Sequence, residues 1–68
     1  MSNTDTFLAA KQWLSARPQL QDRSVDVLVP LVAEGVGVPQ RDIRGLQAVR
    51  EAIKDVQAGG HEPQHLRP

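Results

Sequence analysis

The sequence contains no cysteine, which excludes disulfide crosslinks and thiolate metal sites. Its 68 residues make one domain at most. A chain of this size buries only about 60% of the surface that its unfolded form exposes, so its stability is marginal. Small domains without crosslinks or metals usually gain stability from a partner surface or from oligomerisation. A partner protein, or a second copy of the chain in a homodimer, is therefore expected.

Aromatic residues and excess charge are also scarce. Phe7 and Trp13 are the only aromatic residues, which disfavours a stacking platform for single-stranded nucleic acid. Lys and Arg together number 8, as do Asp and Glu, and the formal net charge is zero. Nucleic-acid-binding proteins usually carry a basic excess, because phosphate neutralisation supplies most of their non-specific affinity. The balanced charge therefore disfavours nucleic acid as the partner, while leaving room for a locally basic helix face.

Long hydrophobic runs are missing as well. No apolar stretch approaches the roughly 20 residues that a membrane span requires. Residues 1–6 lack the basic and apolar regions that make up a signal peptide. The sequence therefore predicts a cytoplasmic protein that does not interact with a membrane.

Three segments carry the periodicity of amphipathic helices, and the first covers residues 6–17. Phe7, Ala10 and Leu14 recur at intervals of three and four residues, which places them on one face of a helix. Pro18 ends this helix, because a proline disfavours helical geometry in the residue before it. The polar residues that follow Pro18 predict a connecting loop.

Residues 24–38 are rich in valine, and a β-branched run of this kind is compatible with a strand. No second strand-like run exists to pair with it, and a lone strand leaves its backbone groups unsatisfied. A helix over residues 26–35 is the better interpretation, since Pro30 then falls close to the first turn, where proline is tolerated. The sequence leaves open whether Pro30 begins or kinks this helix. Gly37 is expected to end it in the left-handed conformation.

The longest expected helix covers residues 40–57. Its apolar seam follows spacings of 3, 3, 4 and 3 residues and consists of Ile43, Leu46, Val49, Ile53 and Val56. Gly45 lies inside this segment, where glycine costs about 1 kcal/mol relative to alanine. Either another group packs close to the backbone at Gly45, or the helix breaks there and a second one begins near Leu46.

These elements predict an all-α fold, a small three-helix bundle formed by a single domain over residues 1–58. Residues 59–68 include two glycines and two prolines and are expected to form a flexible, disordered tail. The expected core takes apolar residues from one face of each helix. It consists of Phe7, Ala10, Trp13, Leu14, Leu28, Leu31, Val32, Val36, Ile43, Leu46, Val49 and Ile53.

The segment that joins the second and third helices shows a defined spacing of small and apolar residues. A small residue is followed four positions later by glycine and then by an apolar residue. Two further apolar residues come six and nine positions after that glycine. These residues are Ala33, Gly37, Val38, Ile43 and Leu46. In this spacing, residues 28–48 resemble helix-turn-helix proteins, in which the small residue allows the helices to cross closely and the glycine forms the turn.

The resemblance implies a DNA-binding role for the third helix. By analogy, the side facing the major groove of duplex DNA would be formed by Gln40, Arg41, Arg44 and Ala48. The two arginines could contact guanine or phosphate, and Gln40 could contact adenine. Gly45 would permit close approach of the backbone.

A second resemblance points to protein partners instead. Residues 31–45 are similar to ubiquitin-associated domains and to the peripheral-subunit-binding domains of acyltransferase complexes, in the succession of short helix, glycine-containing turn and helix. These are small three-helix adaptor domains, so this resemblance implies a protein-binding role. It identifies no site residues.

No catalytic site is predicted. His61, Glu62 and His65 match the H-E-x-x-H pattern of zinc proteases, in which a helix directs both histidines to one metal. Pro63 disfavours that helix, and a chain of this length offers neither a third ligand nor a substrate cleft. We therefore expect no enzyme activity, no cofactor and no bound metal.

Two functions remain open from the sequence. The first is a non-catalytic protein-interaction module or inhibitor that acts on a larger protein partner, and the balanced charge, small size and valine-rich segment favour it. The second is a helix-turn-helix transcriptional regulator that binds duplex DNA. The binding residues expected in either case are Gln40, Arg41, Arg44, Gly45 and Ala48.

Overall fold

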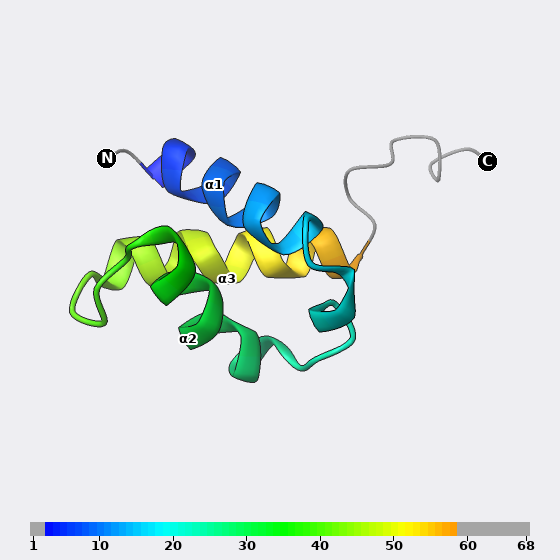
Figure 1. Ribbon diagram of the computed structural model, residues 1–68. Coiled ribbons are helices and arrows are strands. Elements are labelled where there is room, and N and C mark those ends of the chain that lie inside the picture. The colour runs from blue at the N-terminus through cyan, green and yellow to red at the C-terminus, as the bar shows by residue number, and fades with distance from the viewer. Residues whose placement is uncertain (1–2, 59–68) are drawn as a thin grey trace.

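The computed structural model describes residues 3–58, which fold into three α-helices and one short 3₁₀-helix (Figure 1). Helix α1 spans Asn3–Ser15, η1 spans Pro18–Leu20, α2 spans Val25–Val36 and α3 spans Ile43–Gln57. The predicted all-α, three-helix architecture is confirmed. The predicted tail, residues 59–68, lies outside the described residues.

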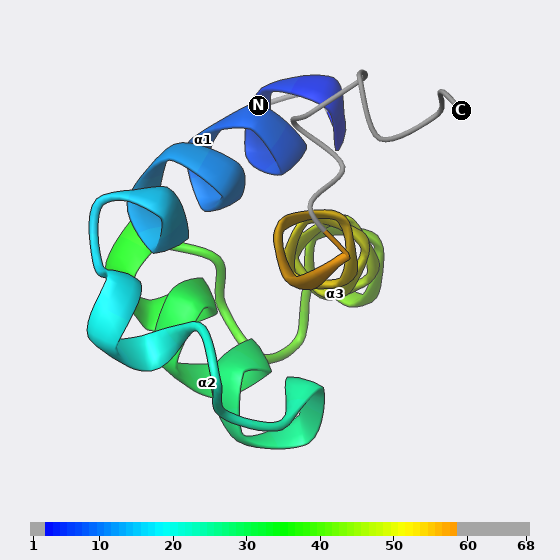
Figure 2. The same cartoon turned by 90° about the vertical axis from the view of Figure 1, so that its right-hand side faces the viewer.

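Helix α3 is the centre of the bundle. Within residues 3–58, α1 and α2 lie against the same side of α3, as the view along its axis shows (Figure 2). Helix α1 packs more extensively on α3 than on α2. An ion pair between Lys11 Nζ and Asp55 Oδ2, at 2.6 Å, also joins α1 to α3. The first and last helices of the domain are therefore packed directly on each other.

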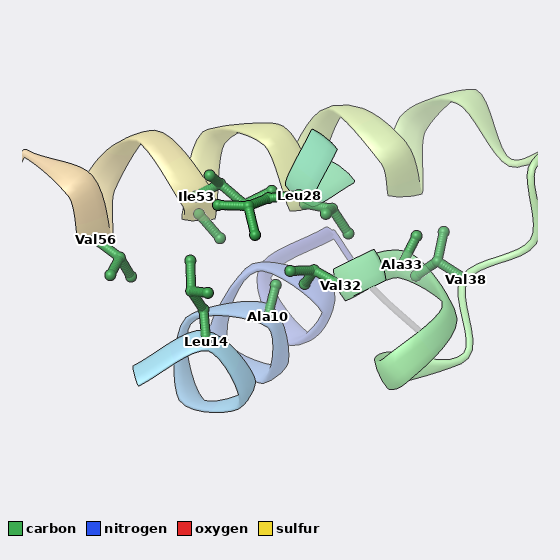
Figure 3. Close-up of a cluster of buried hydrophobic side chains, with 10 residues drawn as sticks. Ala10, Leu14, Leu28, Val32, Ala33, Val38, Ile53 and Val56 are labelled. Atoms are coloured by element: carbon green, nitrogen blue, oxygen red, sulfur yellow. The ribbon is translucent and has the colours of Figure 1, made fainter. Parts of the chain in front are cut away.

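The core lies where the three helices meet (Figure 3). Its largest fully buried side chains are Leu14, Leu28, Val32, Val49 and Ile53. Burying each such side chain contributes about 1.5–3 kcal/mol, so these residues dominate the stability of the fold. Four alanines are also buried and allow the helices to approach closely: Ala10, Ala33, Ala48 and Ala52. Phe7, Trp13, Val36 and Leu46, all expected in the core, pack against it half-buried.

Two residues that the sequence placed in the core are exposed. Leu31 keeps 42% of its surface exposed and Ile43 keeps 64%. Helix α2 turns Leu28, Val32 and Ala33 toward the core, and a helix cannot direct all of its apolar residues to one side. Ile43 is the first residue of α3, where its side chain remains outside the core.

Helix α1 ends at Ser15, two residues earlier than predicted, and begins at Asn3 rather than near residue 6. Arg17 precedes Pro18 and has a non-helical backbone conformation, as expected for a residue before proline. Two side chains satisfy the exposed carbonyls of the last turn. Arg17 Nη1 donates to the carbonyl of Trp13 at 3.0 Å, and Gln21 Nε2 donates to that of Leu14 at 3.1 Å.

Helix α2 begins at Val25 because the Ser24 side chain accepts a hydrogen bond from the backbone N–H of Val27. Pro30 lies inside the helix rather than in its first turn, at an exposed position. Gly37 ends the helix with φ of 82°, so the predicted left-handed residue is confirmed. The N–H of Val38 then reaches back to the carbonyl of Ala33 at 2.8 Å, which completes the helix cap.

Helix α3 begins at Ile43, three residues later than predicted. The N–H of Asp42 donates to the carbonyl of Pro39 at 3.0 Å, which closes a turn through the intervening residues. The Asp42 side chain then caps the helix, because its Oδ1 accepts from the N–H of Gly45 at 2.9 Å. A Cβ on Gly45 would lie 2.6 Å from Asp42 Oδ2 and 2.8 Å from Val38 Cγ1. Close packing, rather than a helix break, therefore accounts for Gly45.

Candidate functional site

Helix α2 exposes an apolar face. Val27 and Leu31, which lie one helical turn apart, keep 48% and 42% of their surfaces exposed. Pro30 and Glu34 are also exposed and lie on the same side of the helix. We call these four residues the α2 face. Exposed aliphatic side chains that cluster in this way are typical of interaction surfaces, whereas isolated ones are ordinary.

A groove runs beside the α2 face, between α2 and the first turn of α3. It encloses about 380 Å³ and is lined by Val29, Pro30, Ala33, Glu34, Val38, Pro39, Gln40 and Leu46. Six of these eight residues are apolar, so the groove favours an apolar side chain over a charged one. Pro30 and Glu34 belong to both the α2 face and this α2–α3 groove, which makes the two features one continuous surface.

Charges of opposite sign flank this surface. The only charged residues of α2 are acidic, Asp26 and Glu34. Asp26 pairs with Arg50 of α3, with 3.3 Å between Oδ1 and Nη2, whereas Glu34 has no charged partner within residues 3–58. Arg41 and Arg44, near the start of α3, are exposed and likewise have no charged partner among the described residues. The acidic and basic groups are therefore separated along the surface.

The five predicted binding residues do not form one surface. Gln40 and Arg41 lie in the connection before α3, and Gln40 lines the α2–α3 groove. Arg44 is exposed on the first turn of α3, whereas Gly45 is buried there. Ala48 is buried with 9% of its surface exposed. The resemblance to helix-turn-helix proteins placed all five toward one partner, but two of them face the protein interior.

Arg44 and Ala48 line a second hollow rather than the α2–α3 groove. It encloses about 340 Å³ between the beginnings of α1 and α3 and is lined by Asn3, Thr4, Phe7, Arg44, Gln47, Ala48 and Glu51. Five of these seven lining residues are polar and exposed, and the apolar ones are the half-buried Phe7 and the buried Ala48. This hollow has no buried polar group that would select a ligand.

The outward side of α3 carries charges of both signs. Arg44, Gln47, Arg50 and Lys54 are exposed along it, but so is Glu51. Lys54 Nζ lies 3.9 Å from Glu51 Oε2, and Arg50 is already engaged by Asp26. Two of the basic groups on α3 are thus partly neutralised, and the side is mixed rather than uniformly basic.

Neither a cluster of metal ligands nor a membrane-spanning helix occurs within residues 3–58. Within residues 3–58, no three side chains of His, Cys, Asp or Glu gather as a metal site would require. The H-E-x-x-H residues, His61 to His65, lie outside the described residues. No helix of residues 3–58 is long and apolar enough to cross a bilayer.

Sequence reasoning missed the residues that make the surface most distinctive. Val27 and Glu34 were not among the expected binding residues, and Leu31 and Ile43 were assigned to the core. A signal for this exists in the sequence, because Val27 and Leu31 share a spacing of four that is offset from the buried pair Leu28 and Val32. A helix that carries two apolar stripes can bury only one of them against a single core, so the other stripe stays exposed.

We compared the chain with protein-family models, curated proteins and solved structures, and none of the three comparisons found a match. The functional proposal therefore rests on the surface described above and on its physical chemistry.

Proposed function

We propose that this chain is a small, non-catalytic protein-interaction module of the cytoplasm, which binds a larger protein partner through the α2 face and the α2–α3 groove. The observation that carries the proposal is the exposure of Val27 and Leu31 beside an apolar groove. An aliphatic residue outside the core forgoes about 1.5–3 kcal/mol of burial energy, and two such residues side by side next to an apolar groove are typical of an interaction surface.

The shape of the surface favours an extended or helical segment of the partner. A groove of about 380 Å³ has room for one or two apolar side chains, and the α2 face adds an exposed apolar surface beside it. Helix-in-groove recognition uses this arrangement, in which a few apolar anchors supply most of the affinity. Binding in this way could inhibit the partner by covering one of its own surfaces.

Site-specific photo-crosslinking in cells tests this function. A photoreactive residue placed at Leu31 should form adducts with one defined partner protein, whereas the same residue at Leu8 should not. Leu8 is a matched control, because it is also leucine in a helix and is 50% exposed, but it lies on α1. With the purified partner, Leu31→Asp should weaken binding at least about tenfold and Leu8→Asp should leave it unchanged. Equal adducts from both positions would refute the proposed surface.

DNA binding is a second candidate, favoured by the exposed, unpaired Arg41 and Arg44 beside Gln40. If duplex DNA is the ligand, affinity should fall steeply with salt, and Arg41→Ala/Arg44→Ala should reduce it. Leu31→Asp should then have no effect. A double variant that binds DNA as well as the wild type would remove this candidate.

A further inference from the structure

The beginning of α3 presents an apolar side chain between two cations. Among the large hydrophobic residues of the described range 3–58, Ile43 is the most exposed, at 64%. Arg41 and Arg44 flank it, both exposed and without a charged partner within residues 3–58. We call these three residues the basic tip. An exposed aliphatic side chain flanked by positive charges is complementary to a surface that is apolar and acidic.

The α2 face has that character. Val27, Pro30 and Leu31 are its apolar part, and Glu34 is its acidic end. Helix α2 contains no basic residue that would repel an approaching arginine. The same chain therefore carries both the basic tip and a surface complementary to it, the α2 face.

The basic tip lies near the end of the α2 face that carries Glu34. Pro39 and Gln40 line the α2–α3 groove and directly precede Arg41, and Leu46 lines it one turn after Ile43. The connection that carries Arg41 emerges where α2 ends and α3 begins (Figure 1). The α2 face of its own chain does not cover Ile43, because Ile43 keeps 64% of its surface exposed.

We propose that a second copy of this chain occupies the α2 face, with Ile43 of each copy packed against Val27 and Leu31 of the other. Arg41 and Arg44 of each copy then lie beside Glu34 of the other. The inference rests on the interaction surface of the proposed function and names an occupant for it when the larger partner is absent. Both contacts form at once through a two-fold axis, so each surface covers its exposed aliphatic groups.

A chain of 68 residues can offer only a small interface, so we expect reversible pairing. Standard interfaces bury about 800 Å² on each partner, and smaller ones are weak. Dissociation in the micromolar range, from about 1 to about 100 µM, is expected. Association of this strength leaves the surface available to a tighter-binding protein.

A charge-swap experiment on the full chain tests the pairing. Glu34→Arg places arginine against arginine, and Arg41→Glu/Arg44→Glu places glutamate against glutamate, so each variant alone should be monomeric by sedimentation equilibrium. An equimolar mixture of the two restores both contacts and should form a heterodimer, with an affinity within about threefold of the wild type. Residues 34, 41 and 44 are exposed, and far-UV circular dichroism verifies that each variant is folded.

Two further variants separate this surface from others. Leu31→Asn should raise the dissociation constant at least about tenfold, whereas Leu8→Asn on α1 should leave it unchanged. A wild-type chain that stays monomeric up to about 1 mM would overturn the inference. So would a dimer that survives Glu34→Arg, because its interface must then lie elsewhere.

Failure of this inference differs from failure of the proposed function. A monomeric wild type whose Leu31 photo-crosslinks to a larger partner leaves the function intact and removes the second copy. The opposite outcome is a dimer that responds to the charge-swap variants as expected, while Leu31 forms adducts only with a second copy of the chain. This outcome supports the inference and removes the larger partner.

Discussion

Trp13 joins α1 to α2 through a close contact with a glycine. A Cβ built on Gly35 would overlap the indole ring of Trp13, so the ring occupies the space that any other residue would fill. The guanidinium of Arg17 lies over the same ring, 4.0 Å from its centroid. Gly35 thus has a packing role that helical periodicity could not reveal, because Trp13 and Gly35 are distant along the chain.

Replacing Gly35 by alanine should displace the indole. We expect Gly35→Ala to destabilise the fold by about 1–3 kcal/mol, as other overpacked contacts do. Trp13 is the only tryptophan, so its fluorescence reports the change directly, and its emission should move to longer wavelength as the ring becomes wetter. Ala16→Gly, at an exposed position directly after α1, serves as the spectral control. An unchanged spectrum with unchanged stability would contradict the contact.

Gly45 should show the opposite of the usual helix rule. Alanine normally stabilises a helix by about 1 kcal/mol relative to glycine. Here the added methyl group would lie 2.6 Å from Asp42 Oδ2 and 2.8 Å from Val38 Cγ1, so Gly45→Ala should instead cost about 1–3 kcal/mol in urea unfolding. Gln47→Ala, at an exposed position of the same helix, should change stability by less than about 0.5 kcal/mol. If Gly45→Ala instead stabilised the fold, the Asp42 side chain would have moved aside without an energetic cost, and the prediction would be wrong.

At the scale of the element, the start of α3 is set by one side chain. Asp42→Ala removes the acceptor for the Gly45 N–H and should destabilise the fold by about 1 kcal/mol. Asp42→Asn retains an oxygen at the same place and should cost only a few tenths of that amount. Thermal unfolding of the two variants measures the difference. Equal losses would mean that the charge of Asp42, rather than its hydrogen bond, is what stabilises the helix.

The number and type of the helices could be predicted because spacings of three and four residues identify amphipathic helices directly. Their ends depend on single hydrogen bonds, which periodicity does not register. Residues 40–42 were assigned to α3, but the turn from Pro39 to Asp42 and the Asp42 cap exclude them from it. An aspartate three residues before a glycine amide was a readable cap signal that the apolar seam concealed.

The core was harder to predict than the helices, for a physical reason. Hydrophobicity favours Leu31 and Ile43 for burial, yet small residues decide which side of each helix can approach its neighbour. Ala33 on α2 and Ala52 on α3 are buried and allow that approach, while Leu31 points elsewhere. Leu31 was missed as a binding residue for the same reason, because its hydrophobicity placed it in the expected core.

At the scale of the whole molecule, a few side chains hold a small fold together. Ile53 is fully buried among all three helices, and Ile53→Ala should cost about 2–5 kcal/mol. Domains are stable by about 5–15 kcal/mol and small ones lie at the lower end, so this change removes most of the stability. Far-UV circular dichroism should show a largely unfolded chain at elevated temperature. Leu8→Ala, at a half-exposed site, should keep the wild-type melting curve.

The direct packing of α1 on α3 also decides when the chain can fold. Isolated helices of 12 or 13 residues, such as α2 and α1, are only marginally stable. Both helices pack on α3, which is synthesised after them. A nascent chain that ends at residue 42 contains α1 and α2 but lacks α3, the helix on which both of them pack. We therefore expect folding to begin only after Gln57 has left the ribosome, and until then the aliphatic residues of α1 and α2 should be accessible to chaperones and proteases.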